Sequence, residues 1–169
     1  MAQNNPENQS EVYTRCYYDH KVKSPLLVYD AVDGHVIDTL YNSARNDAWL
    51  RLTILESDYG WFKIKELTIT PPSKSKEDYK DYWVKSENFI VFVDHKIDLN
   101  SLDVAYLYDL PSTQANRIHK LDQFQKVMVT EVTENWSRVK FEVDTNEIEG
   151  WLHLKHQISN PLTVLSKFK

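Results

Sequence analysis

Apolar and polar side chains alternate along most of this chain. In the first such segment, residues 12 to 18, every second residue falls on one side of the backbone. Successive side chains of a β-strand point to opposite faces, so this period of two predicts strands. No long block rich in Ala, Leu, Glu and Lys predicts a helix, and the expected fold class is therefore all-β. The other segments with this alternation or with a short apolar run are 26–29, 36–40, 49–55, 61–67, 82–85, 89–93 and 127–132.

Turn residues and a charged insert separate the predicted strands. Asp33-Gly34 and Tyr59-Gly60 mark tight turns, because glycine readily adopts the positive φ that a sharp reversal needs. A longer polar stretch begins at Pro71-Pro72 and mixes lysines with acidic residues. It predicts an exposed loop insert over residues 68–81. Residues 1–11 are polar, and we expect them to form a disordered tail.

Several short motifs occur twice, in the same order, in the two halves of the sequence. Such an ordered recurrence predicts an internal duplication. The spacing between equivalent motifs drifts, because the loops of the two copies differ in length. The four pairs of motifs are Asp19-His20-Lys21-Val22 with Asp94-His95-Lys96-Ile97, Tyr29-Asp30 with Tyr108-Asp109, Trp61 with Trp136, and Trp83-Val84 with Trp151-Leu152.

The order of these motifs resembles that of bacterial Src-homology-3-like (SH3b) domains. Such a domain has a Tyr-Asp opening, alternating strands, a central tryptophan and a last strand with another tryptophan, as in Gly150-Trp151. The resemblance covers Leu26 to Val93 and Val104 to Pro161. It implies two small SH3-like β-barrels in tandem. The implied division is a first domain over residues 12–93, a linker over 94–103 and a second domain over 104–169.

The resemblance also implies a ligand-binding groove in each domain. In SH3-like domains, the tyrosine of the opening motif and the central tryptophan line a shallow groove. The aspartate after each tyrosine is expected to meet an amine of the ligand. The candidate ligand-binding residues are therefore Tyr29, Asp30, Trp61, Tyr108, Asp109 and Trp136.

Two positions of each groove depart from the family pattern. Lys85 and His153 stand where a proline is usual. Asn88 and His156 stand where an aromatic residue closes the groove. A groove for proline-rich peptides is therefore not expected in either domain.

The tryptophans have different expected environments. Trp83 and Trp151 stand beside an aliphatic residue in predicted strands, so we expect them to pack in the core. For Trp61 and Trp136, the rim of the core and the wall of a groove stay open as alternatives. An exposed aromatic pair would offer a large contact area at little cost in conformational entropy.

Composition and charge narrow the range of functions. The net charge is −5 and is spread without long runs of one sign, which offers nucleic acid no basic surface. Cys16 is the one cysteine of the sequence, so no disulfide forms within the chain. No apolar run reaches the ~18 residues that a membrane-spanning helix needs.

No recognisable motif for catalysis, a metal or a cofactor occurs. His153 and His156 form the one close histidine pair, and no carboxylate or cysteine at ligand spacing completes a zinc site. Neither Cys16 nor any serine stands in a known nucleophile motif, and no glycine-rich phosphate loop occurs. We therefore expect a protein that is not an enzyme and that needs no cofactor.

These observations favour a non-catalytic binding module of a bacterial cell envelope. Its expected ligand is a cell-wall (peptidoglycan) peptide or an envelope protein, held by the aromatic grooves. The alternative is an inhibitor or immunity-type protein that blocks a partner enzyme with an acidic, tyrosine-rich face. The polar N-terminus leaves two locations open: the cytoplasm, or the periplasm and cell envelope after removal of a leader. The pattern does not indicate an oligomeric state.

Overall fold

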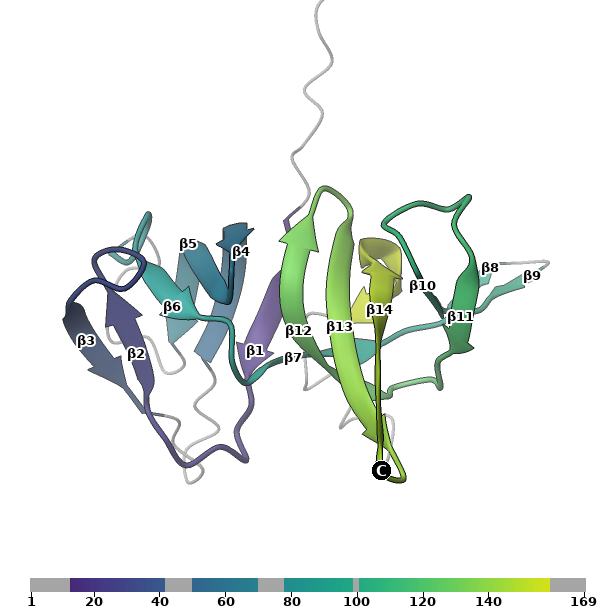
Figure 1. Ribbon diagram of the computed structural model, residues 1–169, viewed down its shortest axis with the longest axis horizontal. Coiled ribbons are helices and arrows are strands. Elements are labelled where there is room, and N and C mark those ends of the chain that lie inside the picture. Colours follow the sequence, from purple (N-terminus) through teal and green to yellow (C-terminus); the bar gives the residue numbers. More distant parts are fainter. Residues whose placement is uncertain (1–12, 42–49, 70–77, 99–100, 159–169) are drawn as a thin grey trace, which may run out of the picture.

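The computed structural model describes residues 13–41, 50–69, 78–98 and 101–158 (Figure 1). It confirms the all-β prediction, because strands and one short 3-10 helix make up the regular structure of these residues. The predicted tail, 1–11, and residues 70–77 of the predicted insert lie outside them. No helix in the described ranges is long and apolar enough to cross a membrane.

The strands fall into two groups that follow each other along the chain. The first group is β1 (Arg15–Tyr18), β2 (Leu26–Tyr29), β3 (Val36–Leu40), β4 (Leu50–Asp58), β5 (Trp61–Ile69), β6 (Trp83–Lys85) and β7 (Phe89–Val93). The second group is β8 (Lys96–Asp98), β9 (Ser101–Asp103), β10 (Tyr106–Tyr108), β11 (Arg117–Lys120), β12 (Lys126–Thr133), β13 (Trp136–Val143), β14 (Asn146–His153), the 3-10 helix η1 (Leu154–His156) and β15 (Gln157–Ile158).

Thirteen of the strands form one antiparallel sheet that runs through both groups. Its order is β11-β10-β14-β13-β12-β7-β1-β4-β5-β6-β2-β3, and β15 pairs with β7 beside this path. The sequence predicted two β-barrels in tandem; in the structure thirteen described strands belong to one sheet that is not closed, and β8 with β9 forms a second, two-stranded sheet. The reason is that a strand in the middle, β7, pairs with strands of both groups.

The shared strand β7 uses both of its edges. Its residues Ile90 to Phe92 pair with β12 on one edge. On the other edge, Ile90 pairs with Tyr17 of β1, and Phe92 pairs with Ile158 of β15. The strands β1 and β15 therefore lie along the same edge of β7, one after the other.

The two halves of the sheet pair in matching registers, as the internal repeat predicts. Cys16 of β1 faces Leu52 of β4, and at the equivalent place Val91 of β7 faces Val127 of β12. Each half also has a bulge at the end of its first hairpin, before Tyr29 in one and before Tyr108 in the other. Three further pairings of the first half have an equivalent in the second. They are Trp61–Lys85, equivalent to Trp136–His153; Lys63–Trp83, equivalent to Arg138–Trp151; and Tyr29–Trp83, equivalent to Tyr108–Trp151.

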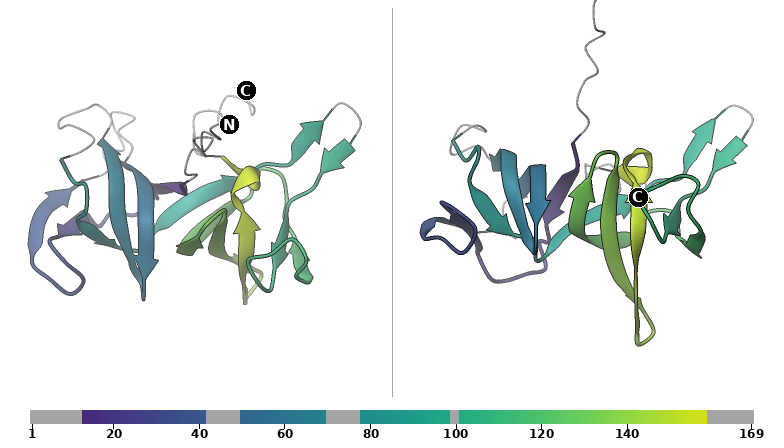
Figure 2. Two further views of the ribbon diagram at one scale, coloured as in Figure 1. Left: turned by 90° about the horizontal axis from the view of Figure 1, so that it is seen from above. Right: turned by 45° about the horizontal axis from the view of Figure 1, so that its top comes forward.

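This register makes β7 the counterpart of β1 as well as the last strand of the first half. The repeated Asp-His-Lys motif follows both strands, at Asp19 and at Asp94. The segment 94–103, predicted as a linker, carries the β8–β9 hairpin, which projects from the second half (Figure 2). The first half thus supplies a strand that the second half uses.

One continuous core and several side-chain hydrogen bonds join the halves among the described residues. Side chains from both halves, such as Phe62, Phe89 and Leu152, belong to a single buried cluster. The Thr14 and Ser137 hydroxyls, both buried, lie 3.0 Å apart in a hydrogen bond between the halves. Two further contacts are Ser57 Oγ with the Val132 backbone, at 3.1 Å to the carbonyl and 3.0 Å to the amide, and Lys126 Nζ with Asp19 Oδ2, at 2.8 Å.

Candidate functional site

The predicted tyrosines and tryptophans meet in pairs, one pair in each half. The Tyr29 and Trp61 ring centroids lie 4.9 Å apart, with the rings at 90°. Those of Tyr108 and Trp136 lie 5.4 Å apart, at 81°. Tyr29 lies on β2 and Trp61 at the start of β5, and both strands pair with β6, which brings the two rings edge to face across it. Aromatic pairs favour this geometry.

The two central tryptophans, for which the rim of the core and the wall of a groove were the alternatives, are buried. Trp61 is 7% exposed and Trp136 is 6% exposed. The Lys85 ammonium lies 5.7 Å from the centroid of the Trp61 ring, and the His153 ring lies 4.8 Å from that of Trp136. A cross-strand neighbour thus covers each indole, and neither indole forms an exposed wall.

Trp83 and Trp151, predicted in the core, are instead half-buried. Each pairs across the strands with a basic residue, Lys63 or Arg138. The Lys63 ammonium lies 5.6 Å from the centroid of the Trp83 ring. The prediction for these two tryptophans is therefore wrong. An aliphatic neighbour in sequence lies on the opposite face of a strand and says little about the face that carries the indole.

Asp30 and Asp109 each close the loop that follows their own tyrosine. Asp30 Oδ1 accepts a hydrogen bond from the His35 amide at 2.7 Å. Asp109 accepts bonds from the Asn116 amide at 3.0 Å and from the Asn116 side chain at 2.8 Å. Both carboxylates are exposed, but these bonds fix them to the loop backbone. Their first role is to shape the loop after β2 or β10.

A hollow of about 230 Å³ opens beside Tyr29 in the first half. Of the six predicted ligand-binding residues, Tyr29 alone lines it. Lys85 and Asn88, the two positions that depart from the family pattern in this half, line it as well. The complete lining is Tyr18, Ser24, Pro25, Leu26, Leu27, Tyr29, Lys85, Glu87 and Asn88.

One wall of this hollow was not predictable from the local sequence pattern. Residues 24 to 27 combine a serine and a proline with the first residues of β2, which reads as an ordinary approach to a strand. Their place in the wall follows from Tyr18 of β1, whose hydroxyl donates to the Ser24 carbonyl at 3.3 Å. That contact joins β1 to the segment before β2, and a local sequence pattern does not reveal it.

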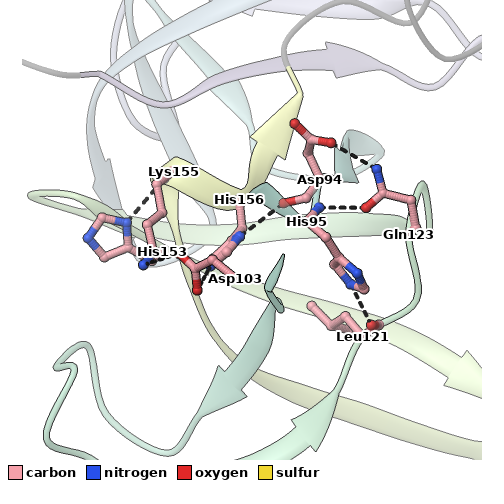
Figure 3. A network of polar contacts seen from close by, with 8 residues as sticks. All are labelled: Asp94, His95, Asp103, Leu121, Gln123, His153, Lys155 and His156. Atoms are coloured by element: carbon pink, nitrogen blue, oxygen red, sulfur yellow. Dashed lines mark hydrogen bonds and ion pairs between the residues drawn. The ribbon is translucent and has the colours of Figure 1, made fainter. Parts of the chain in front are cut away.

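The equivalent place in the second half is tied together by charged side chains (Figure 3). Counted along the chain from the equivalent Tyr29 and Tyr108, and from the equivalent Trp83 and Trp151, Asp103, Lys155 and His156 correspond to Ser24, Glu87 and Asn88. Lys155 Nζ donates to Asp103 Oδ2 at 2.7 Å. The buried His156 lies with Nε2 3.6 Å from Asp103 Oδ1, and its Nδ1 donates to the Asp94 carbonyl at 2.9 Å. Asp103 thus bridges residues whose counterparts line the hollow.

Burial and charge set the protonation of this cluster. Burial lowers the pKa of His156, against the opposing effects of its hydrogen bond to Asp94 and of the Asp103 charge. Burial and the Lys155 charge lower the pKa of His153. The hydrogen bond from Lys155 lowers the pKa of Asp103. Near neutral pH both imidazoles are therefore uncharged, and the ion pair of the cluster is Lys155 with Asp103.

The described residues offer little for metal binding or for thiol chemistry. No three His, Cys, Asp or Glu side chains among them come together to hold a metal ion. Cys16 is fully buried, and burial raises the pKa of its thiol well above the ordinary value. Its Sγ lies 3.8 Å from the Leu52 carbonyl. A protonated thiol inside the core is a poor nucleophile.

Comparisons with known proteins leave the family open. No protein-family model matches the chain, and no curated protein matches it. Among solved structures, the chain is similar to NlpC2 from Trichomonas vaginalis, with a TM-score of 0.32 and 11% identity over 90% of this chain and 50% of that one. For NlpC1 from Trichomonas vaginalis, the TM-score is 0.31 and the identity 11%, over 89% of this chain and 47% of that one. The chain thus spans about half the length of these two proteins, and likenesses this low carry no argument about its fold or function.

Proposed function

We propose that this chain is a non-catalytic binding protein whose first half holds a peptide in the hollow beside Tyr29. The ligand is a cell-wall peptide or a peptide segment of an envelope protein. The observation that carries the proposal is the hollow itself. It lies at the tyrosine that opens the first repeat, where SH3-like domains bind ligands, and Lys85 and Asn88 line it.

We also propose that the two halves are SH3-like units, with the boundary between them moved from the predicted linker 94–103 into β7. The matching registers support this proposal, because both halves present the same hairpins around an edge-to-face Tyr–Trp pair. The shared strand β7 modifies it. The first unit would end, and the second would begin, within one strand.

The lining of the hollow suits a short peptide. Pro25, Leu27 and the Tyr29 ring supply apolar surface, and Ser24 and Asn88 supply polar groups at the same site. Binding sites for small ligands combine an apolar lining with a few polar groups that fix the orientation of the ligand. Tyrosine adds a large, rigid contact area. The second half is tied together at the equivalent place, so we assign one such site to the chain.

A sedimentation experiment with purified bacterial sacculi tests this function. We expect the full chain to pellet with sacculi, and the Tyr29→Ala variant to lose at least roughly fivefold in bound fraction. Tyr108→Ala is the matched control, since it removes the equivalent ring from the second half. Both variants should lose about 2 kcal/mol of stability, measured by denaturant unfolding. A chain that stays in the supernatant, or an equal loss of binding in both variants, would contradict the proposal.

A second candidate function is inhibition of a partner enzyme. The observation in its favour is the exposure of large apolar side chains at loops. Tyr59, at the turn between β4 and β5, is 101% exposed, and Leu110, after β10, is 62% exposed. Exposed side chains of this size suit a protein interface. Copurification with a single protein that Tyr59→Ser releases, without pelleting on sacculi, would favour this candidate.

A further inference from the structure

Two opposite charges, Lys85 and Glu87, stand at the rim of the first-half hollow. Both side chains are exposed, and both line the hollow. Lys85 ends β6, and Glu87 lies in the turn that follows it. Neither has an ion-pair partner among residues 13–41, 50–69, 78–98 and 101–158, whereas Lys63 on the neighbouring strand pairs with Glu56 at 3.3 Å.

The fold does not require this pair of charges. The equivalent residues in the second half are His153 and Lys155. His153 is uncharged near neutral pH, because burial lowers its pKa, and Lys155 is bonded to Asp103 at 2.7 Å. The same turn thus forms with a different charge pattern, so the Lys85–Glu87 pair is a feature of the first hollow alone.

We propose that this hollow binds a short peptide through both of its charged ends. Lys85 binds a carboxylate of the ligand, Glu87 binds an ammonium group, and Tyr29 with Leu27 contacts the segment between them. This inference rests on the proposed function and names the ligand chemistry of its site. A peptide of three residues spans about 10 Å when extended.

Free charges at a rim suit this role. A charged group that already has an ion-pair partner must lose it before it binds a ligand, whereas Lys85 and Glu87 have no ion pair among the described residues, and the Lys85 ammonium contacts only the Trp61 ring, at 5.7 Å from its centroid. Partly exposed ion pairs contribute modestly, so we expect each to change the affinity by roughly fivefold. Two such contacts with opposite sign also fix the direction of the peptide in the hollow.

The test uses the full chain and tri-alanine, with chemical shifts in the nuclear magnetic resonance spectrum as the readout. We expect free tri-alanine to shift the resonances of Tyr29, Leu27 and Asn88. Acetylation of its amine or amidation of its carboxylate should each weaken binding by roughly fivefold, and both together by more. These peptides need no protein variant, so misfolding cannot obscure the result.

A charge exchange in the protein completes the test. Lys85→Glu and Glu87→Lys should each weaken binding of free tri-alanine, and the double exchange should restore it with the peptide reversed. The matched control exchanges two exposed charges of the second half, Lys120→Glu with Glu134→Lys, and should change nothing.

The outcomes separate this inference from the proposed function. Equal binding of the free and doubly capped peptides overturns the proposal that Lys85 and Glu87 bind the charged ends, while the hollow stays the binding site. Pelleting on sacculi without any tri-alanine shift at the hollow also overturns the inference. If the full chain neither pellets with sacculi nor shows shifts with tri-alanine, the proposed function is contradicted as well.

Discussion

Single residues explain why equivalent places in the two halves differ. Lys85 over Trp61 keeps an exposed ammonium at the first site, whereas His153 over Trp136 is half-buried and neutral. At the next equivalent position, Asn88 lines a hollow, whereas His156 is buried with its Nδ1 bonded to the Asp94 carbonyl at 2.9 Å. These two positions thus differ in charge and burial between the halves, beside the Lys155–Asp103 ion pair that the first half lacks.

The two lowered histidine pKa values predict that the protein is less stable in mild acid. Burial lowers the pKa of His153 and His156 from 6.5, so the unfolded chain takes up protons more readily than the folded one. The free energy of unfolding should therefore fall as the pH drops below 6.5, and level off once the pH passes the lowered values.

Thermal unfolding between pH 8 and pH 5 measures this dependence. His156→Gln keeps a donor for the Asp94 carbonyl but cannot titrate, so it should flatten the dependence. His35→Gln is the control, because the His35 side chain is 96% exposed, and it should leave the curve unchanged. A wild-type melting temperature that stays constant across this range would refute the assignment.

At the level of elements, the strand β7 belongs to both halves of the sheet. It ends the first half against β1 and begins the second half against β12 and β15. Its residues Phe89, Val91 and Val93 are buried, and they belong to the core that both halves share. A strand used in this way makes the second half incomplete without the residues that precede it.

Fragments of the chain test this dependence. A fragment of residues 94–169 lacks β7, so the edge of β12 and the side chains of Val127 and Val129 lose their cover. We expect it to lack a cooperative unfolding transition. A fragment of residues 86–169, which includes β7, should regain one. Circular dichroism and dispersion of amide resonances report the difference, and a well-folded 94–169 fragment would contradict the role of β7.

The alternation of side chains was enough to predict strands, and the repeated motifs predicted which pairs would be equivalent. Tyr29 and Trp61 meet as expected, because motif order carries strand order in a repeat. The sharing of β7 was not predictable, since pairing between Ile90 and Tyr17 depends on two edges far apart in sequence. Only part of the lining of the hollow was predictable from the sequence. Lys85 stood out as a departure, whereas the wall at residues 24 to 27 depends on a contact with Tyr18.

At the scale of the whole molecule, the two halves form one structural unit. A continuous sheet, one core cluster and the hydrogen bonds of Thr14 and Ser57 to the second half link them. Unfolding one half would expose the buried edge of the other. We therefore expect a single transition in denaturant, with probes in both halves reporting the same midpoint.

Ser57 offers a direct probe of this coupling. Ser57→Ala removes the hydroxyl that bonds the carbonyl and the amide of Val132, at 3.1 Å and 3.0 Å. The loss should cost about 1–2 kcal/mol and shift the midpoint equally for reporters in both halves. The control Ser112→Ala, in an exposed loop, should cost less than about 0.5 kcal/mol. Separate midpoints for the two halves would contradict the single unit.

The placement of β1 and β15 along one edge of β7 has a topological consequence. Tyr17 and Ile158 pair with residues two apart on that strand, so the first and last strands form consecutive pieces of one line. Among the described residues, the end of β15 thus lies next to the start of β1. We expect a circular permutant that links Ile158 to Arg15 through a short connecting segment, and that opens at Asp144 in the turn between β13 and β14, to keep the strand pairings of the described residues.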